Sequence, residues 1–148
     1  MATSTNDRRK AATAGMLARR LALLALFENE FRPGNAGAAL ERLALEREVP
    51  DEVRAHATRI IDGVSEHRDA LDRRIATEAP LIPVAELGRV ERTILRSAIY
   101  EVLYSAATPS GETMRDAVSL ARIYAGDAAR RLVNGVLGSV SRSPGGGT

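Results

Sequence analysis

The sequence predicts an all-helical protein without a β-sheet. Apolar residues recur at helical spacing in segment after segment, no segment alternates between apolar and polar residues as a strand does, and Pro and Gly separate the segments. Aromatic residues make up only 3% of the 148 residues, so the core must consist of Leu, Val, Ile and Ala, which suits closely packed helices. The chain is long enough for one domain with a substantial core, and each half looks like three helices.

Residues 90–104 form the segment around which we expect the other helices to pack. Its apolar residues repeat at spacings of one, three and four, which gives a wide apolar stripe suited to several neighbours. They are Ile94, Leu95, Ala98, Ile99, Val102 and Leu103. Glu91 and Arg92 make the beginning of this helix polar, so this end can face a partner.

In the first half of the chain, residues 1–10 are polar and lack periodicity, and we expect a flexible basic arm there. A helix should follow over residues 11–31, with a short helix around Leu40 and Leu43. One long helix should then run beyond residue 70, with Asp51 as its N-cap. Gly63 lies within this helix, where it suits a close helix crossing.

In the second half, a proline-flanked loop near residues 78–84 predicts a seam between two subdomains of one domain, residues 11–141. After the 90–104 helix, a further helix should end at Gly126, with Asp127 capping the last one. Gly135 lies within the last helix, where we expect a close backbone approach. Residues 142–148 should form a flexible tail.

Composition excludes several classes of protein. There is no Cys, and therefore no disulfide framework or thiolate metal site. No apolar run reaches 18 residues, which predicts no transmembrane helix. Arg19 and Arg20 precede a short apolar run and imitate a twin-arginine signal, but Glu28 follows directly without a cleavage site. We therefore expect a cytoplasmic protein.

No motif in the sequence predicts catalysis. There is no nucleophile elbow or phosphate loop, and the paired acids suit solvated helix faces better than general acids. His56 and His67 lie on nearly the same face of one helix but lack acids at ligand spacing, so we interpret them as solvated surface residues. We expect no metal, no cofactor and no enzymatic activity.

The net charge is only +2, so the placement of the arginines matters more than their number. They gather towards the two ends of the chain. The clusters are Arg8, Arg9, Lys10, Arg19 and Arg20 at one end, and Arg122, Arg130, Arg131 and Arg142 at the other. If the ends meet, they form one basic surface, with Phe27 and Tyr124 available to stack on unpaired bases. Composition alone favours the alternative of solubilising arginines and core aromatics.

Four segments together resemble the NusB family of transcription antitermination factors. They are residues 18–27, 90–103, 116–122 and 132–137, and their order and spacing fit across roughly residues 15–140. The most specific are Arg-x-Ile-Leu-Arg-x-Ala-x-Tyr-Glu and Val-Asn-Gly-Val-Leu. The resemblance implies two packed three-helix bundles and a non-catalytic protein that binds boxA single-stranded RNA of ribosomal RNA transcripts. It also implies NusE, a small-subunit ribosomal protein, as partner within the transcription elongation complex with RNA polymerase.

The resemblance also implies site residues. Carried over by position, the RNA-binding residues are Arg19, Phe27, Tyr124, Arg131 and Asn134. Their neighbourhood adds Arg20 and the basic residues Arg8, Arg9 and Lys10. Glu91 falls at the NusE-facing position, with Arg92 beside it. The chain departs from the family at Gly15, Met16 and Leu17, where members often carry a run of Arg.

Two alternatives remain open. A NusB-like domain also forms the N-terminal part of an rRNA cytosine methyltransferase, although this chain shows no methyl-donor loop. The second alternative is a helical dimerisation module without an RNA role, because Leu23 and Leu26 would leave apolar surface on the first helix. A homodimer would fit that interpretation.

Overall fold

The computed structural model describes residues 4–32, 34–105 and 109–144. These residues form seven α-helices and a short 3-10 helix, and no strand occurs among them, which confirms the all-helical prediction. In chain order the elements are α1 (Thr5–Phe31), α2 (Ala36–Glu46), α3 (Asp51–Glu66), α4 (Arg68–Glu78), η1 (Val84–Glu86), α5 (Arg89–Tyr104), α6 (Ser110–Ala125) and α7 (Asp127–Arg142).

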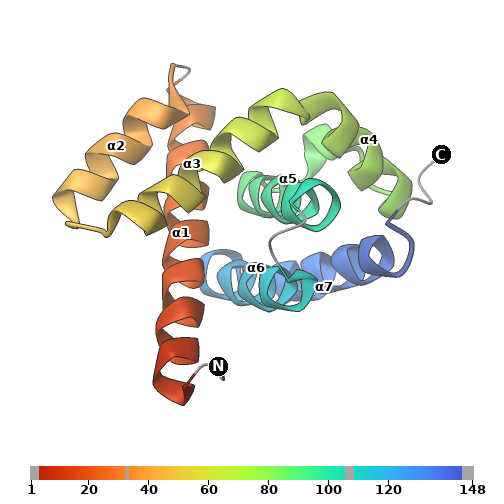
Figure 1. The fold of residues 1–148 in the computed structure, drawn as a ribbon. Coiled ribbons are helices and arrows are strands. Elements are labelled where there is room, and N and C mark those ends of the chain that lie inside the picture. Colours follow the sequence, from red (N-terminus) through yellow and green to blue (C-terminus); the bar gives the residue numbers. More distant parts are fainter. Residues whose placement is uncertain (1–3, 33, 106–108, 145–148) are drawn as a thin grey trace.

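The helices form two bundles, and α5 belongs to the second bundle while also contacting the first (Figure 1). In the first bundle α1 packs against α2 and α3, and in the second α5 packs against α6 and α7, with α4 lying against α5 and α7. Helix α5 also contacts α1 and α3, so the expectation that this segment organises the fold is confirmed. Leu95 and Ile99 on α5 are completely buried.

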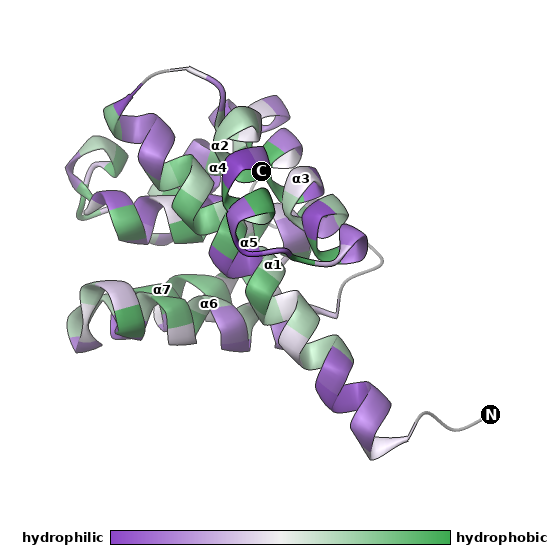
Figure 2. Cartoon of the chain, turned by 90° about the vertical axis from the view of Figure 1, so that its left-hand side faces the viewer, coloured by the Kyte–Doolittle hydropathy of each residue, from purple (hydrophilic) through white to green (hydrophobic). Residues whose placement is uncertain are grey.

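The first helix begins earlier than the sequence pattern indicates. Helix α1 starts at Thr5, so residues 5–10 are its first turns, whereas the sequence pattern places the beginning of this helix at residue 11. Ser4 caps the helix, since its hydroxyl oxygen accepts a hydrogen bond of 3.1 Å from the Asp7 N–H, and Asp7 suits the positive end of the helix dipole. Figure 2 shows these hydrophilic turns extending away from the rest of the molecule.

The described part of the C-terminal tail is held by the fold. The buried guanidinium of Arg74 on α4 donates hydrogen bonds to the carbonyl oxygens of Pro144, at 3.1 Å, and of Ser143, at 2.5 Å. Residues 143 and 144 are therefore hydrogen-bonded to α4 through a charged donor. Residues 145–148 lie outside the described part of the chain.

The long helix expected from Asp51 is two helices. The chain breaks at His67, whose N–H closes α3 on the Gly63 carbonyl at 3.0 Å and whose carbonyl accepts from Leu71 in α4 at 2.9 Å. The His67 ring stacks on Tyr104 with 3.9 Å between ring centroids. Apolar periodicity continues across the break, which explains why the sequence pattern does not reveal it.

The two aspartates expected as N-caps are each the first helical residue instead. Pro50 occupies the cap position before Asp51, and Gly126 occupies the one before Asp127. Gly126 has φ of 96°, a left-handed conformation that glycine adopts without steric cost, so it closes α6 and opens α7.

The two helical glycines have different environments. A Cβ atom at Gly63 would lie 2.1 Å from ring carbons of Tyr100, so the expected close crossing, here between α3 and α5, is confirmed. A Cβ atom at Gly135 would meet nothing within 4 Å among the described residues, so the close approach that this glycine permits does not occur there. Gly135 lies on the exposed side of α7.

The apolar surface expected on the first helix is covered. Leu23 is only 4% exposed, and Leu26 packs against the core as a partly buried residue. The dimerisation alternative therefore loses the observation that supported it. None of the helices in the described residues is long and apolar enough to cross a membrane.

Candidate nucleic-acid interface

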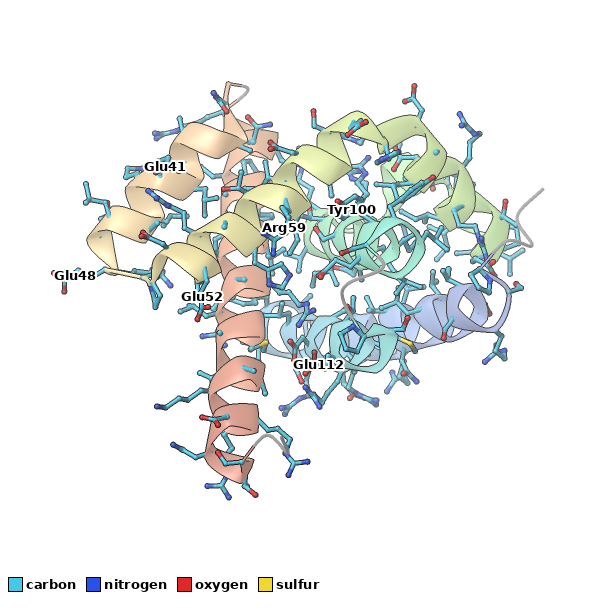
Figure 3. The ribbon with its side chains drawn as sticks, in the orientation of Figure 1. Glu41, Glu48, Glu52, Arg59, Tyr100 and Glu112 are labelled. Atoms are coloured by element: carbon cyan, nitrogen blue, oxygen red, sulfur yellow. The ribbon has the colours of Figure 1, made fainter. Side chains whose placement is uncertain are left out.

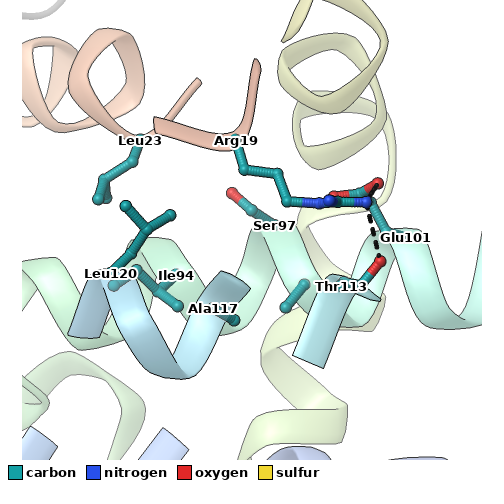
Figure 4. A pocket seen from close by; sticks show the side chains of 9 residues that line it. Arg19, Leu23, Ile94, Ser97, Glu101, Thr113, Ala117 and Leu120 are labelled. Carbon is teal, nitrogen blue, oxygen red and sulfur yellow. Dashed lines mark hydrogen bonds and ion pairs between the residues drawn. The ribbon is translucent and has the colours of Figure 1, made fainter. Parts of the chain in front are cut away.

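Arg19 is the most firmly bound of the expected RNA-binding residues. It is 8% exposed, and its guanidinium donates to Glu101 Oε1 at 2.9 Å and to Asp116 Oδ2 at 2.7 Å. A further hydrogen bond of 3.3 Å reaches the hydroxyl of Thr113 (Figure 4). Because these acceptors occupy the guanidinium, Arg19 is placed to join α1 to α5 and α6, and not to bind a phosphate.

His56 extends this buried network to a fourth helix. Its Nε2 lies 3.0 Å from Glu101 Oε2, and the ring is mostly covered, so the expectation of a solvated histidine is wrong. Burial alone would raise the pKa of Glu101, but hydrogen bonds from His56 and Arg19 outweigh it and lower that pKa. Glu101 of α5 is thus joined to α1 by Arg19 and to α3 by His56, and Arg19 joins α6 to them through Asp116 and Thr113.

The other cations expected on the first helix are accessible. Arg8, Arg9 and Lys10 are exposed on the protruding turns of α1, and no ion pair engages them within the described residues. Arg20 is partly exposed and lines a groove between α1 and α6 together with Arg115. The structure thus leaves four cations along α1 free to meet an anion.

The expected residues of the last helices are also at the surface. Tyr124 at the end of α6 is 41% exposed, and Asn134 on α7 is exposed. Arg131 is exposed but forms an ion pair with Asp127. Hydrogen bonding from Arg130 lowers the pKa of Asp127, so this carboxylate stays ionised and partly offsets the positive charge at the beginning of α7.

Phe27 contacts residues near the junction of α1 and α5. Its ring meets Phe31 edge to face with centroids 5.0 Å apart, and the guanidinium of Arg89 lies 4.5 Å from the Phe31 ring centroid. Arg89 begins α5, close in the chain to Glu91. Phe27 is therefore grouped with the expected partner-binding end of α5.

Glu91 and Arg92 differ in their availability. Glu91 is partly exposed, and no ion pair holds it in the described part of the chain. The Arg92 side chain is 12% exposed, lies 3.5 Å from Glu30, and donates to the Ala85 carbonyl at 3.3 Å. Arg92 therefore fastens η1 to the first bundle, which leaves Glu91 as the residue free to meet a partner.

Arg115 and Arg89 are candidate residues that the sequence interpretation missed. Each is an isolated arginine on a helix, and only the packing of α6 against α1, or of α5 beside Phe31, places it near other candidates. The end of the first bundle formed by α2 and the beginning of α3 carries Glu41, Glu48 and Glu52 (Figure 3), and Arg54 pairs with Glu41 there at 3.2 Å.

Nothing in the described residues suggests a metal centre. No group of three or more His, Asp or Glu side chains is placed to hold a metal ion there. The two histidines have other roles, since His56 pairs with Glu101 and His67 stacks on Tyr104.

The family model for the NusB family matches residues 16–142. This chain belongs to the NusB family. Among curated NusB-family relatives, the transcription antitermination protein NusB of Dehalococcoides mccartyi is 34% identical over 139 residues, covering 94% of this chain and 92% of the relative. The NusB protein of Symbiobacterium thermophilum is 35% identical over 133 residues, covering 84% and 87%.

Solved NusB structures share this fold. A complex of antitermination factors NusB and NusE with double-stranded RNA matches with a TM-score of 0.80 and 26% identity, over 88% of this chain and 98% of the matched chain. T. maritima NusB matches with a TM-score of 0.80 and 27% identity, over 86% and 90%. The family expected from the sequence is confirmed.

Proposed function

We propose that this protein is a non-catalytic transcription antitermination factor that binds the boxA segment of ribosomal RNA transcripts together with NusE. The observation that carries the proposal is the match over most of both chains to a NusB protein solved with NusE and RNA. It would act in the cytoplasm, within the elongation complex that contains RNA polymerase. The alternative relation to an rRNA cytosine methyltransferase is less well supported, because the matched curated relatives are NusB proteins.

The RNA surface of this proposal consists of exposed cations and polar groups on α1, α6 and α7. Its members are Arg8, Arg9, Lys10, Arg20, Tyr124, Arg131 and Asn134. Exposed arginines can bind phosphates without first losing a buried partner, and an exposed tyrosine can stack on a base. Arg19 supports this surface indirectly, by holding α1 against α5 and α6 through Glu101 and Asp116.

The NusE surface of the proposal lies at the junction of α1 and α5. Phe27, Phe31 and Arg89 form a contacting group there, and Glu91 supplies a carboxylate without an ion pair in the described residues. Phe31 is 55% exposed. An exposed aromatic beside free charges of both signs suits a protein partner, since aromatic residues and arginines are enriched at interfaces.

The proposal can be tested by fluorescence anisotropy with a labelled boxA RNA, measured with and without NusE over a range of salt concentrations. Replacing Arg131 by Gln should weaken binding of all RNA sequences and reduce the slope of log affinity against log salt by about 0.7. The matched control is Arg73→Gln, which removes an exposed arginine on α4 and should leave that slope unchanged.

The NusE surface has its own test. Glu91→Lys should weaken NusE binding in calorimetric titration while thermal stability stays close to that of the wild type, because Glu91 makes no ion pair in the described residues. Unchanged NusE affinity would remove Glu91 from the interface. Absence of RNA binding at low salt, even with NusE present, would contradict the proposed function as a whole.

A further inference from the structure

A groove of about 520 Å³ runs between α1 and α6. Helix α1 contributes Thr13, Met16, Leu17 and Arg20 to its walls, and α6 contributes Arg115 and Asp116. Met16 and Leu17 line it without contributing charge. Its cations therefore come from elsewhere, one from the next turn of α1 and one from the facing helix.

Arg20, which lines this groove, has an unsatisfied donor. Its Nε is buried without a hydrogen-bond partner, and within the described residues no carboxylate pairs with its guanidinium. A buried N–H that lacks an acceptor costs free energy, and the terminal nitrogens of the same guanidinium are not among the buried unsatisfied atoms. Arg20 is thus a cation whose hydrogen-bonding capacity the folded chain itself leaves unused.

Arg115 faces the same groove with little compensation. Its side chain is 60% exposed, and its Nε lies 3.8 Å from Asp116 Oδ1, beyond hydrogen-bond distance. The other oxygen of Asp116 accepts a hydrogen bond of 2.7 Å from Arg19. Asp116 is the one carboxylate among the residues that line the groove, and it is shared between Arg19 and the more distant Arg115, so Arg20 and Arg115 together leave the groove positively charged.

The row of cations continues along α1 beyond the groove. Arg9, Thr13 and Arg20 are separated by four and seven residues, so they share one face of the helix. At 1.5 Å per residue, Arg9 and Arg20 are about 16 Å apart along the helix axis. Two cations at this separation on one helix face suit a chain of phosphates better than a single small anion.

We propose that the groove between α1 and α6 binds the phosphate backbone of single-stranded RNA through Arg20 and Arg115. The inference rests on the proposed function. It adds Arg115 of α6 to the RNA-binding residues and places the RNA backbone along the groove between α1 and α6. Guanidinium groups bind phosphate with two parallel hydrogen bonds, and Arg20 and Arg115 supply one such group from each wall. Met16 and Leu17 provide an apolar wall between them.

The test is an anisotropy titration of labelled boxA RNA and of a scrambled RNA of equal length, with NusE present, across a range of salt concentrations. The proteins are the wild type, Arg20→Gln, Arg115→Gln, the double variant and the control Arg73→Gln. Each single variant should reduce the salt slope by about 0.7 and weaken both RNAs about fourfold at about 0.15 M salt. The double variant should lose about twice that slope, and the control should lose none.

Failure of this inference can be told from failure of the proposed function. Variants that keep the full slope while Arg131→Gln loses affinity would overturn the groove and leave the proposed function standing. Variants that bind RNA normally but lose affinity for polyglutamate would assign the groove to an acidic partner, and so would also overturn it. Circular dichroism melting checks folding, and the exposed Arg115 keeps the test decisive if Arg20→Gln unfolds.

Discussion

Replacing Arg19 by Met should destabilise the protein strongly, although Arg19 looks like a surface cation in the sequence. The change removes the donor that satisfies Glu101 and Asp116, whose side chains are 2% and 8% exposed. Leaving a buried charge without its partner costs about 3–5 kcal/mol. Glu101 keeps His56 at 3.0 Å and Asp116 keeps Arg115 at 3.8 Å, so we expect the lower end, about 3 kcal/mol.

The measurement is urea unfolding followed by far-UV circular dichroism near neutral pH. The matched control is Arg20→Met, the same chemical change at the next residue, which has no ion pair in the described part of the chain and should cost about 1 kcal/mol or less. RNA titration of the Arg19 variant, under conditions where it remains folded, separates the structural role from a direct phosphate contact.

The pH dependence gives an independent check. Because the pKa of Glu101 is lowered in the folded protein, its ionised form stabilises the fold above the ordinary carboxyl pKa of about 4.3, and this stability is lost as the pH falls through the lowered value. The difference between wild type and the Arg19 variant should therefore shrink on acidification. This reasoning would be refuted if Arg19→Met lowered the unfolding free energy by less than about 1 kcal/mol at neutral pH, or if that loss did not shrink in acid. It would also be refuted if the variant reduced the salt slope of RNA binding by a full phosphate contact.

Further substitutions test the packing and the network. Gly63→Ala should lower the unfolding free energy by about 1–3 kcal/mol, because its methyl group would overlap the Tyr100 ring, whereas Gly135→Ala, at an open position, should raise it by about 0.5–1 kcal/mol. If chemical unfolding showed that both substitutions change the unfolding free energy in the same direction, the two glycines would not have the different environments described above. Leu137→Ala should cost about 2–5 kcal/mol at a completely buried site, and a smaller loss would indicate a core that collapses around the cavity. Glu101→Gln should reduce the loss of unfolding free energy that accompanies falling pH. An unchanged loss would show that other carboxylates cause it.

The sequence by itself determined the fold class, the family and most helix positions. Apolar periodicity is a local property, since residues three and four apart share a helix face whatever the helix packs against. The pattern of residues 90–104 therefore identified α5 as the central helix, and Gly63 marked a crossing. The same locality explains two errors, because periodicity runs undisturbed through the break at His67 and does not show that Ser4 starts α1 early.

Tertiary structure decided which charges are free to act. Arg19 and Arg20 are adjacent and chemically alike, but the helix turns by about 100° between neighbours, so Arg19 enters the bundle and Arg20 enters a groove. Whether a charge is buried depends on acceptors that lie far along the chain, here Glu101, which is 82 residues away, and Asp116, which is 97 away. A local pattern holds no information about such partners, because only the packing of α1 against α5 and α6 brings them together.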